Sequence, residues 1–186
     1  MNVGIVSARY AEALLKYVNE TGNGDAVYKQ TGILEKCFST LEDMRMLIYN
    51  PKATSDELKM RVLTTAVGGR EKAAPELVKF FRLVMKNKRT KFLHLILRIF
   101  MEKYRETRNI SWARLTVASP SEELERKLAG TLQEITGREL ELETRTDPSL
   151  IGGFIFDMEW TRLDASIASQ LNTVKRQFIE KNRRIV

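Results

Sequence analysis

The hydrophobic period of this chain changes near Arg108, and this change restricts the fold more than any other feature. Before Arg108, apolar residues recur at helical spacing, as in the first stretch, where Tyr10, Leu14 and Val18 share one helical face. After Arg108, "SWARLTVASP" is short and rich in β-formers, and "RELELETR" alternates apolar and charged residues. Helical and strand periods in separate halves predict a helical bundle followed by a smaller unit that contains a sheet.

Glycine and proline mark the expected helix ends in the first half. Glycine tolerates the left-handed conformation with which many helices end, and proline disfavours a helical conformation in the residue before it. The predicted boundaries are a stop at Gly22–Gly24, a stop at Asn50–Pro51, a capping box from Thr54 to Glu57, a stop at Gly68–Gly69, a start at Pro75 and an interruption at Asn87–Thr90.

The second half predicts the order strand, helix, strand, strand, helix. Its first helix runs from a Ser121 cap to a Gly137 stop, and "LIGGFIFDM" is interpreted as a buried strand that contains the glycine pair. The predicted fold is therefore a two-domain α+β protein, with an N-terminal six-helix bundle over residues 1–106 and a small C-terminal α/β domain over residues 107–186. The final helix is lined by Ile167, Leu171, Val174 and Phe178.

Charge is distributed unevenly along the chain. The net charge is +7, with +8 in residues 1–105 and −1 in residues 106–186. A basic first half suits nucleic acid, anionic lipid or an acidic protein partner, or simply a solvated helical surface. No apolar run is long enough to span a membrane, and the first residues do not form a secretory signal, so a cytoplasmic-type compartment is expected.

Residues with catalytic or ligand-binding chemistry are few. His94 is the single histidine, and Cys37, the single cysteine, lies on an apolar stripe, which favours a core thiol. Neither glycine pair matches a nucleotide-binding motif. Asp157, Glu159 and Asp164 are the nearest carboxylate set, but alternation around a hairpin explains them better than metal binding. We therefore expect no catalytic, cofactor-binding or metal-binding residues.

The densest basic cluster is "VMKNKRTKF", Val84 to Phe92. Phosphate contacts would be one use for these cations, which leaves a basic nucleic-acid-binding α/β protein as the alternative function. No recognition-helix or aromatic strand motif accompanies the cluster, so a solvated turn between helices is the competing interpretation.

The segment "DPSLIGGFIFDMEWTRLDASIASQLNTVKRQF" resembles the C-terminal signature of the delta subunit of F-type ATP synthases, the oligomycin-sensitivity-conferring protein family. Further stretches resemble the family in the same order: "ARYAEALL", the Asn50-Pro51 break, "FFRLVMKNKRTKFLHLILRIFMEKY" and "ARLTVASPSEELERKL". Two departures stand out: Ala165 replaces the glycine of the family's Asp-Gly-Ser, and "EWTR" replaces its Gly-Asp hairpin turn. The signature residues are Asp147, Pro148, Gly152, Gly153, Asp164 and Ser166.

The resemblance implies a non-catalytic stator subunit in the peripheral stalk of the proton-transporting ATP synthase, on the cytoplasmic face of a bacterial plasma membrane. It implies that the helical domain binds the N-terminal segments of the alpha subunits, mainly through its first and fifth helices, and that the C-terminal domain binds the b subunits. It implies no cofactor, no nucleic acid and no direct membrane span. The candidate partner-binding residues are Ala8, Tyr10, Ala11, Tyr28 and Phe80 in the helical domain and Lys175, Arg176, Phe178 and Ile179 in the final helix.

Overall fold

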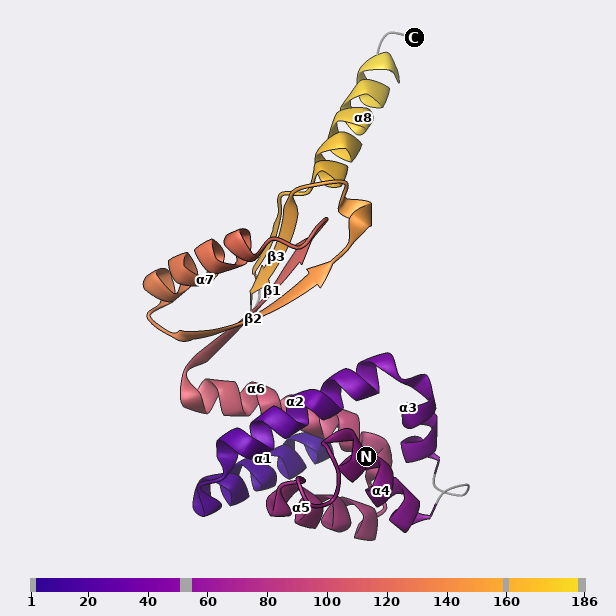
Figure 1. The fold of residues 1–186 in the computed structure, drawn as a ribbon. Helices are drawn as coiled ribbons and strands as arrows, with labels where there is room; N and C mark the ends of the chain where they lie inside the picture. Colours follow the sequence, from indigo (N-terminus) through magenta and orange to yellow (C-terminus); the bar gives the residue numbers. More distant parts are fainter. Residues whose placement is uncertain (1–2, 51–54, 159–160, 184–186) are drawn as a thin grey trace. The chain divides into compact units, whose positions relative to one another are not determined.

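The structure is a computed structural model that describes residues 3–50, 55–158 and 161–183 (Figure 1). The chain divides into two compact units, the helical unit (Met1–Tyr104) and the sheet unit (Arg105–Val186). The combination of helices with a sheet confirms the predicted α+β class. The elements are α1 (Val3–Thr21), α2 (Gly24–Thr40), α3 (Glu42–Tyr49), α4 (Asp56–Ala66), α5 (Pro75–Lys86), the 3₁₀ turn η1 (Thr90–Phe92), α6 (Leu93–Arg108), β1 (Ile110–Val117), α7 (Glu122–Thr136), β2 (Glu139–Thr146), the 3₁₀ turn η2 (Pro148–Leu150), β3 (Phe154–Met158), β4 (Thr161–Asp164) and α8 (Ile167–Arg183).

Most helix ends of the helical unit lie where glycine and proline predict them. Gly22, with φ +72°, follows the last residue of α1, and Pro75 is the first residue of α5. The cap of α4 is a correction. Its N-cap is Ser55, whose hydroxyl accepts a 3.2 Å hydrogen bond from the Leu58 backbone N–H, whereas Thr54, the predicted cap, lies outside the described residues.

The core of the helical unit collects large apolar side chains from several helices. Leu14 of α1, Phe38 of α2, Phe81 of α5 and Phe100 of α6 are each at most 1% exposed. Burying one such side chain stabilises a fold by about 1.5–3 kcal/mol, so these residues hold the helices together. Spacing at i, i+3 and i+4 along each helix places them on its inner face.

The sheet unit is built on β1, which pairs on both sides. The strand order is β2-β1-β3-β4, with β1 parallel to β2 and antiparallel to β3, and β3 antiparallel to β4. Along β1, buried and half-buried residues alternate, so Ala113 and Leu115 face the small core. Leu128 and Leu132 of α7 pack on that core, and Figure 1 shows α7 beside the sheet.

Two details of the sheet unit differ from the sequence prediction. Gly152 and Gly153 lie in the bend before β3 and not inside a strand, because Ile151 (φ +65°) and Gly153 (φ +72°) have left-handed backbones that a strand does not accept. A fourth strand, β4, follows β3 and completes the hairpin anticipated around Asp157 to Asp164. The hairpin residues 159–160 lie outside the described part of the chain.

Candidate partner-binding site

The glycine pair fixes the position at which the last helix starts. A Cβ on Gly152 would lie 2.6 Å from Cδ1 of Ile167, and a Cβ on Gly153 would overlap the backbone carbonyl of Ala165. The Ile167 N–H donates a 3.0 Å hydrogen bond to the Gly152 carbonyl, and the Ala165 N–H donates a 2.9 Å bond to the Phe154 carbonyl. The absence of side chains at the glycines therefore lets the base of α8 rest directly on the bend before β3.

Asp164 and Ser166 together form the cap of α8. The Asp164 carboxylate accepts hydrogen bonds from the Ser166 N–H (3.0 Å), the Ser166 hydroxyl (2.7 Å) and the Ser169 hydroxyl (2.7 Å). The Ser166 hydroxyl in turn accepts a 3.3 Å bond from the Ser169 N–H, as an N-cap residue does. Hydrogen bonds from the Ser166 and Ser169 side chains lower the pKa of Asp164 to about 2. Sequence reasoning missed Ser169, although serine three residues after Ser166 was a signal for it.

Asp147 and Pro148 turn the chain at the start of the signature. The Asp147 carboxylate accepts a 2.9 Å hydrogen bond from the Ser149 N–H, and Pro148 opens the short turn η2. Hydrogen bonds from Ser149 lower the pKa of Asp147. Leu150, the last residue of η2, is buried and only 6% exposed. The helix α8 contacts η2. The signature residues thus act together to anchor α8.

The exposed side chains of α8 form the first candidate surface. Lys175 and Arg176 are exposed, and Ile179 is 50% exposed. The side chain of Phe178 lies outside the described set. Partner binding by these four residues stays a prediction, and the three described ones are accessible for it.

The candidate residues of α1 and α5 lie where these helices pack together. Ala8 and Tyr10 are half-buried, whereas Ala11 (0% exposed) and Phe80 (4%) belong to the core. The Tyr10 and Phe80 rings meet edge to face, with centroids 6.5 Å apart, and Asn87 donates a 2.9 Å hydrogen bond to the Tyr10 hydroxyl. Ala11 and Phe80 are therefore buried between α1 and α5, whereas Ala8 and Tyr10 are partly exposed to solvent. Partner binding by these residues stays a prediction.

Tyr28 lies in the core of the helical unit and is 8% exposed. Its ring stacks on Tyr104, with centroids 4.8 Å apart and planes 18° apart. The Tyr104 hydroxyl donates a 2.6 Å hydrogen bond to Asp25. Tyr28 thus packs inside the bundle, and its proposed contact with a partner stays a prediction.

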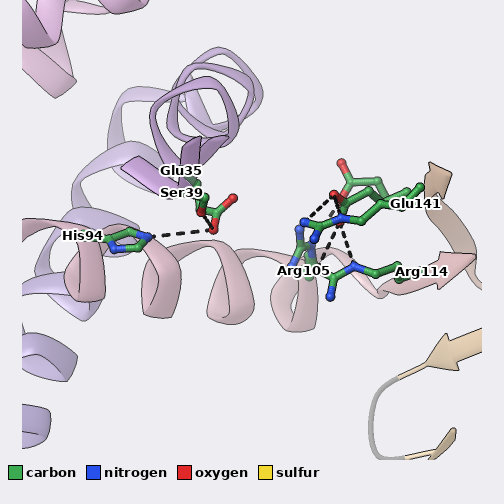
Figure 2. Close-up of polar contacts among 8 residues, drawn as sticks. Glu35, Ser39, His94, Arg105, Arg114 and Glu141 are labelled. Carbon is green, nitrogen blue, oxygen red and sulfur yellow. Dashed lines mark hydrogen bonds and ion pairs between the residues drawn. The ribbon is translucent and has the colours of Figure 1, made fainter. Parts of the chain in front are cut away.

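His94 faces a carboxylate across the helical unit (Figure 2). Its Nε2 lies 3.8 Å from Oε1 of Glu35, which also accepts a 3.0 Å hydrogen bond from Ser39, and its ring stacks 5.2 Å from that of Phe38. Burial lowers the pKa of His94, and this effect outweighs the opposing effect of Glu35. His94 is a packed helical residue, and no third residue orients it for proton transfer among the interactions described around it.

The other chemical candidates have ordinary surroundings. Cys37 is half-buried and lines a cavity of about 340 Å³ together with apolar residues such as Leu41 and Leu58. Oδ1 of Asp157 lies 3.7 Å from Nε of Arg162, and Glu159 is outside the described residues.

Within the described residues, no group of three or more histidine, cysteine or carboxylate side chains is arranged to hold a metal ion. Across those same residues, no helix is both long and apolar enough to cross a membrane.

Arginine side chains of α6 and β1 pair with glutamate side chains of β2 (Figure 2). Arg105 Nε lies 3.0 Å from Oε2 of Glu141, and Arg114 donates to Glu143 at 3.2 Å. The Cζ atoms of both guanidinium groups lie over the Trp112 ring, at 5.5 and 4.8 Å from its centroid. Burial alone would raise the pKa of Glu143, but hydrogen bonds and charges from arginines lower it. Arg105 and Arg114 therefore form ion pairs with glutamates of the same chain.

The fold defines a class: an α+β protein with a helical unit and a sheet unit, each of which has exposed apolar side chains on its helices. The model of the ATP synthase delta (OSCP) subunit family matches residues 6–178. The ATP synthase subunit delta of Phocaeicola vulgatus is 41% identical over 187 residues, and that of Bacteroides fragilis is 40% identical, each comparison covering the whole of both chains. The chain therefore belongs to the ATP synthase delta (OSCP) subunit family.

A solved structure supports the fold independently. A chain in the cryo-EM structure of the Toxoplasma gondii mitochondrial ATP synthase hexamer aligns with a TM-score of 0.66 at 21% identity, covering 93% of this chain and 97% of that one. The family consists of non-catalytic subunits of the ATP synthase, so the chain is not itself an enzyme.

Proposed function

We propose that this chain is a peripheral-stalk subunit that links the catalytic head of the F-type ATP synthase to its membrane sector and resists the torque of the rotor. The observation that carries this proposal is that apolar side chains stay exposed on helices of both units: Ile5 of α1 is 61% exposed and Leu171 of α8 is 55% exposed. A connector needs two binding surfaces and no reaction centre. The family match over residues 6–178 supports the same role.

The helical domain, residues 1–106, binds the N-terminal segments of alpha subunits through α1 and α5. Val3 and Ile5 on α1 and Leu83 on α5 are 43%, 61% and 45% exposed, so apolar area is available on both helices. Ala8 lies one turn from Ile5, and its small side chain lets a partner helix approach closely. An amphipathic helix with apolar residues at i, i+3, i+4 and i+7 fits such a surface.

The C-terminal domain, residues 107–186, holds the b subunits of the stalk, with Lys175, Arg176, Phe178 and Ile179 of α8 in the contact. The anchored base of α8 supports this assignment, because a helix that transmits force needs a fixed start. The complex places the chain at the periphery of the bacterial plasma membrane, on its cytoplasmic face.

The alpha-subunit contact is tested with a peptide that copies the N-terminal segment of the alpha subunit from the same organism. Isothermal titration calorimetry measures its affinity for the full-length chain. We expect Ala8→Arg to weaken binding by about tenfold, because the long cation blocks close helix approach. Ala13→Arg is the matched control, since Ala13 is exposed on α1 but lies five residues further along, on a different side of the helix.

Equal affinities of the two arginine variants would remove α1 from the proposed contact, and absence of binding to the unmodified chain would contradict the alpha-subunit assignment altogether.

The basic cluster between α5 and α6 allows a test of the alternative, nucleic-acid-binding function. It forms the interhelical turn around Lys88 (φ +54°), and Lys91 lies 4.9 Å from the Phe92 ring. Salt-dependent binding of duplex DNA would favour the nucleic-acid function instead.

A further inference from the structure

The helix α5 starts without a cap of its own. Its N-cap residue is Ala74, whose side chain has no hydrogen-bonding group, and Pro75 occupies the first helical position. Serine, threonine, aspartate and asparagine are the residues that usually satisfy the free N–H groups at a helix start. Ala74 is only 5% exposed, so water has little access to its N–H. A group from another part of the chain is therefore needed at this helix start.

Gln30 of α2 provides that group. Its side-chain oxygen accepts a 2.8 Å hydrogen bond from the Ala74 N–H, and its side-chain nitrogen donates a 2.7 Å bond to the Lys72 carbonyl. One amide thereby satisfies a backbone donor and a backbone acceptor in the loop that connects α4 to α5. This loop contains Gly68 and Gly69, with φ values of +99° and +104°, so its own backbone restricts it little.

Asn23 binds the first turn of α5. Its side-chain nitrogen donates a 2.9 Å hydrogen bond to Oε2 of Glu76, which is 8% exposed. Asn23 occupies the N-cap position of α2, where asparagine usually bonds to the backbone of its own helix, but here its side chain makes no such bond. Its amide is used instead for a contact with a residue 53 positions away in the sequence.

Asn23 and Gln30 act from one side of α2. They are seven residues apart, which is about two helical turns, so their side chains leave α2 in nearly the same direction. Their contacts reach the end of the loop and the first turn of α5. We name these two residues the α2 clamp. Contacts at two separate points restrict both the position of α5 along its axis and its rotation about that axis.

We infer that the α2 clamp positions the partner-binding surface of the helical unit: it holds α5 where Leu83 and the exposed residues of α1 fit one partner helix. This inference rests on the proposed function, in which α1 and α5 contact the alpha subunit, and it gives two residues of a third helix a role in that contact. Without the clamp, only the fraction of molecules with α5 in place binds the partner. A fivefold smaller fraction weakens the apparent affinity about fivefold.

The experiment uses the full-length chain and the peptide that copies the N-terminal segment of the alpha subunit. Calorimetry measures the affinity, and NMR measures the hydrogen-exchange rate of the Ala74 amide. Gln30→Met keeps the side-chain length and a similar helix propensity but removes the amide. We expect the Ala74 amide to exchange about tenfold faster and the peptide to bind about fivefold more weakly. In the unmodified chain, saturating peptide should slow the exchange of Ala74, because the coupling is reciprocal.

Gln30→Glu separates the two hydrogen bonds of the amide. It keeps an acceptor for the Ala74 N–H and loses the donor to the Lys72 carbonyl. We expect it to restore part of what Gln30→Met loses, in the Ala74 exchange rate and in the peptide affinity alike.

Asn23→Asp tests the second contact. Aspartate has the size of asparagine and caps a helix equally well, but its carboxyl group would face that of Glu76 without an N–H to donate. We expect peptide binding to weaken by about threefold or more.

Ile48→Val is the matched control for a general loss of stability. It removes one fully buried methyl group from α3 and should leave the peptide affinity within about twofold. Urea unfolding compares the stability of this control with that of the clamp variants.

Unchanged exchange of Ala74 in Gln30→Met would overturn the clamp itself. Equal peptide affinities of the unmodified chain, Gln30→Met and Asn23→Asp would show that these contacts only stabilise the fold. A loss of affinity in Ile48→Val as large as that in Gln30→Met would lead to the same conclusion. Absence of peptide binding to the unmodified chain would instead contradict the proposed function, and with it the role of the clamp in that contact. The two failures are distinguishable because the exchange rate of Ala74 is measured without peptide.

Discussion

A side chain on Gly153 would overlap the backbone carbonyl of Ala165, so the two residues fix each other's place at the base of α8. Gly153 has φ +72°, whereas Ala165 does not have a left-handed backbone. The demand for glycine at this junction therefore falls on position 153 and not on position 165. This explains how Asp164-Ala165-Ser166 replaces the family's Asp-Gly-Ser without loss of the cap.

Replacement of Gly153 by alanine should destabilise the sheet unit by about 3 kcal/mol, because left-handed strain adds to a backbone overlap that cannot relax cheaply. Gly137→Ala is the control: Gly137 also has a left-handed φ, +63°, but nothing lies within 4 Å of its added Cβ, so we expect a loss of about 1 kcal/mol. Urea unfolding followed by tryptophan fluorescence reports on this unit, since both tryptophans, Trp112 and Trp160, belong to it. Equal losses in the two variants would contradict the overlap.

Asp164 should make the stability of the sheet unit depend on pH in the acid range. Hydrogen bonds from Ser166 and Ser169 lower its pKa from an ordinary 3.8 to about 2 in the folded state. A lowered pKa contributes stability that is present above the ordinary value and is lost as the pH falls through about 2. Asp164→Asn should flatten the decline of unfolding free energy between these two values, measured by urea unfolding at a series of pH values. An unchanged pH profile would show that the carboxylate is not held as described.

Loss of the Tyr104 hydroxyl should destabilise the helical unit. Tyr104→Phe removes the 2.6 Å hydrogen bond to the Asp25 carboxylate, and bonds to charged groups are worth about 1.5–3 kcal/mol. We expect a loss near the lower limit, about 1.5 kcal/mol, because the bond is only partly buried. Tyr17→Phe is the control, since its exposed hydroxyl accepts a 3.3 Å bond from Lys79 and its loss should cost at most about 0.5 kcal/mol. Thermal unfolding followed by far-ultraviolet circular dichroism compares the two variants.

His94 should give the helical unit a separate dependence on pH. Burial lowers its pKa below 6.5, with Arg98 and Arg45 acting in the same direction and Glu35 against it. Protonation therefore favours the unfolded state, and the unfolding free energy should decrease as the pH falls through 6.5 toward the folded pKa. His94→Gln should remove this decrease. Because the chain has one histidine, its NMR signal titrates alone, and a midpoint above 6.5 would show that Glu35 dominates instead.

Local features of the fold could be predicted from the sequence, whereas contacts between distant segments could not. Pro75 and Gly22 mark helix ends because their backbone restrictions act within one or two residues. Gly152-Gly153 was misplaced into a strand, since the reason for the bend is the later segment at Ala165.

The sequence likewise could not predict which residues of α8 are exposed to solvent. The periodic stripe at Ile167, Leu171 and Val174 predicts a helix with one apolar face, but periodicity does not reveal whether that face is covered. Burial of Tyr28 and Phe80 likewise follows from packing between helices, which one sequence does not specify.

The stacked Tyr104 ring also limits how related sequences vary. A Cβ on Gly24 would lie 2.8 Å from Cε2 of Tyr104, and the ring is held by Tyr28 and Asp25. A larger residue at position 24 therefore requires a smaller one at position 104. In an alignment of relatives, a lineage with a larger residue at position 24 should therefore have a smaller residue at position 104, 80 positions further on, whereas a smaller residue at position 104 is compatible with Gly24.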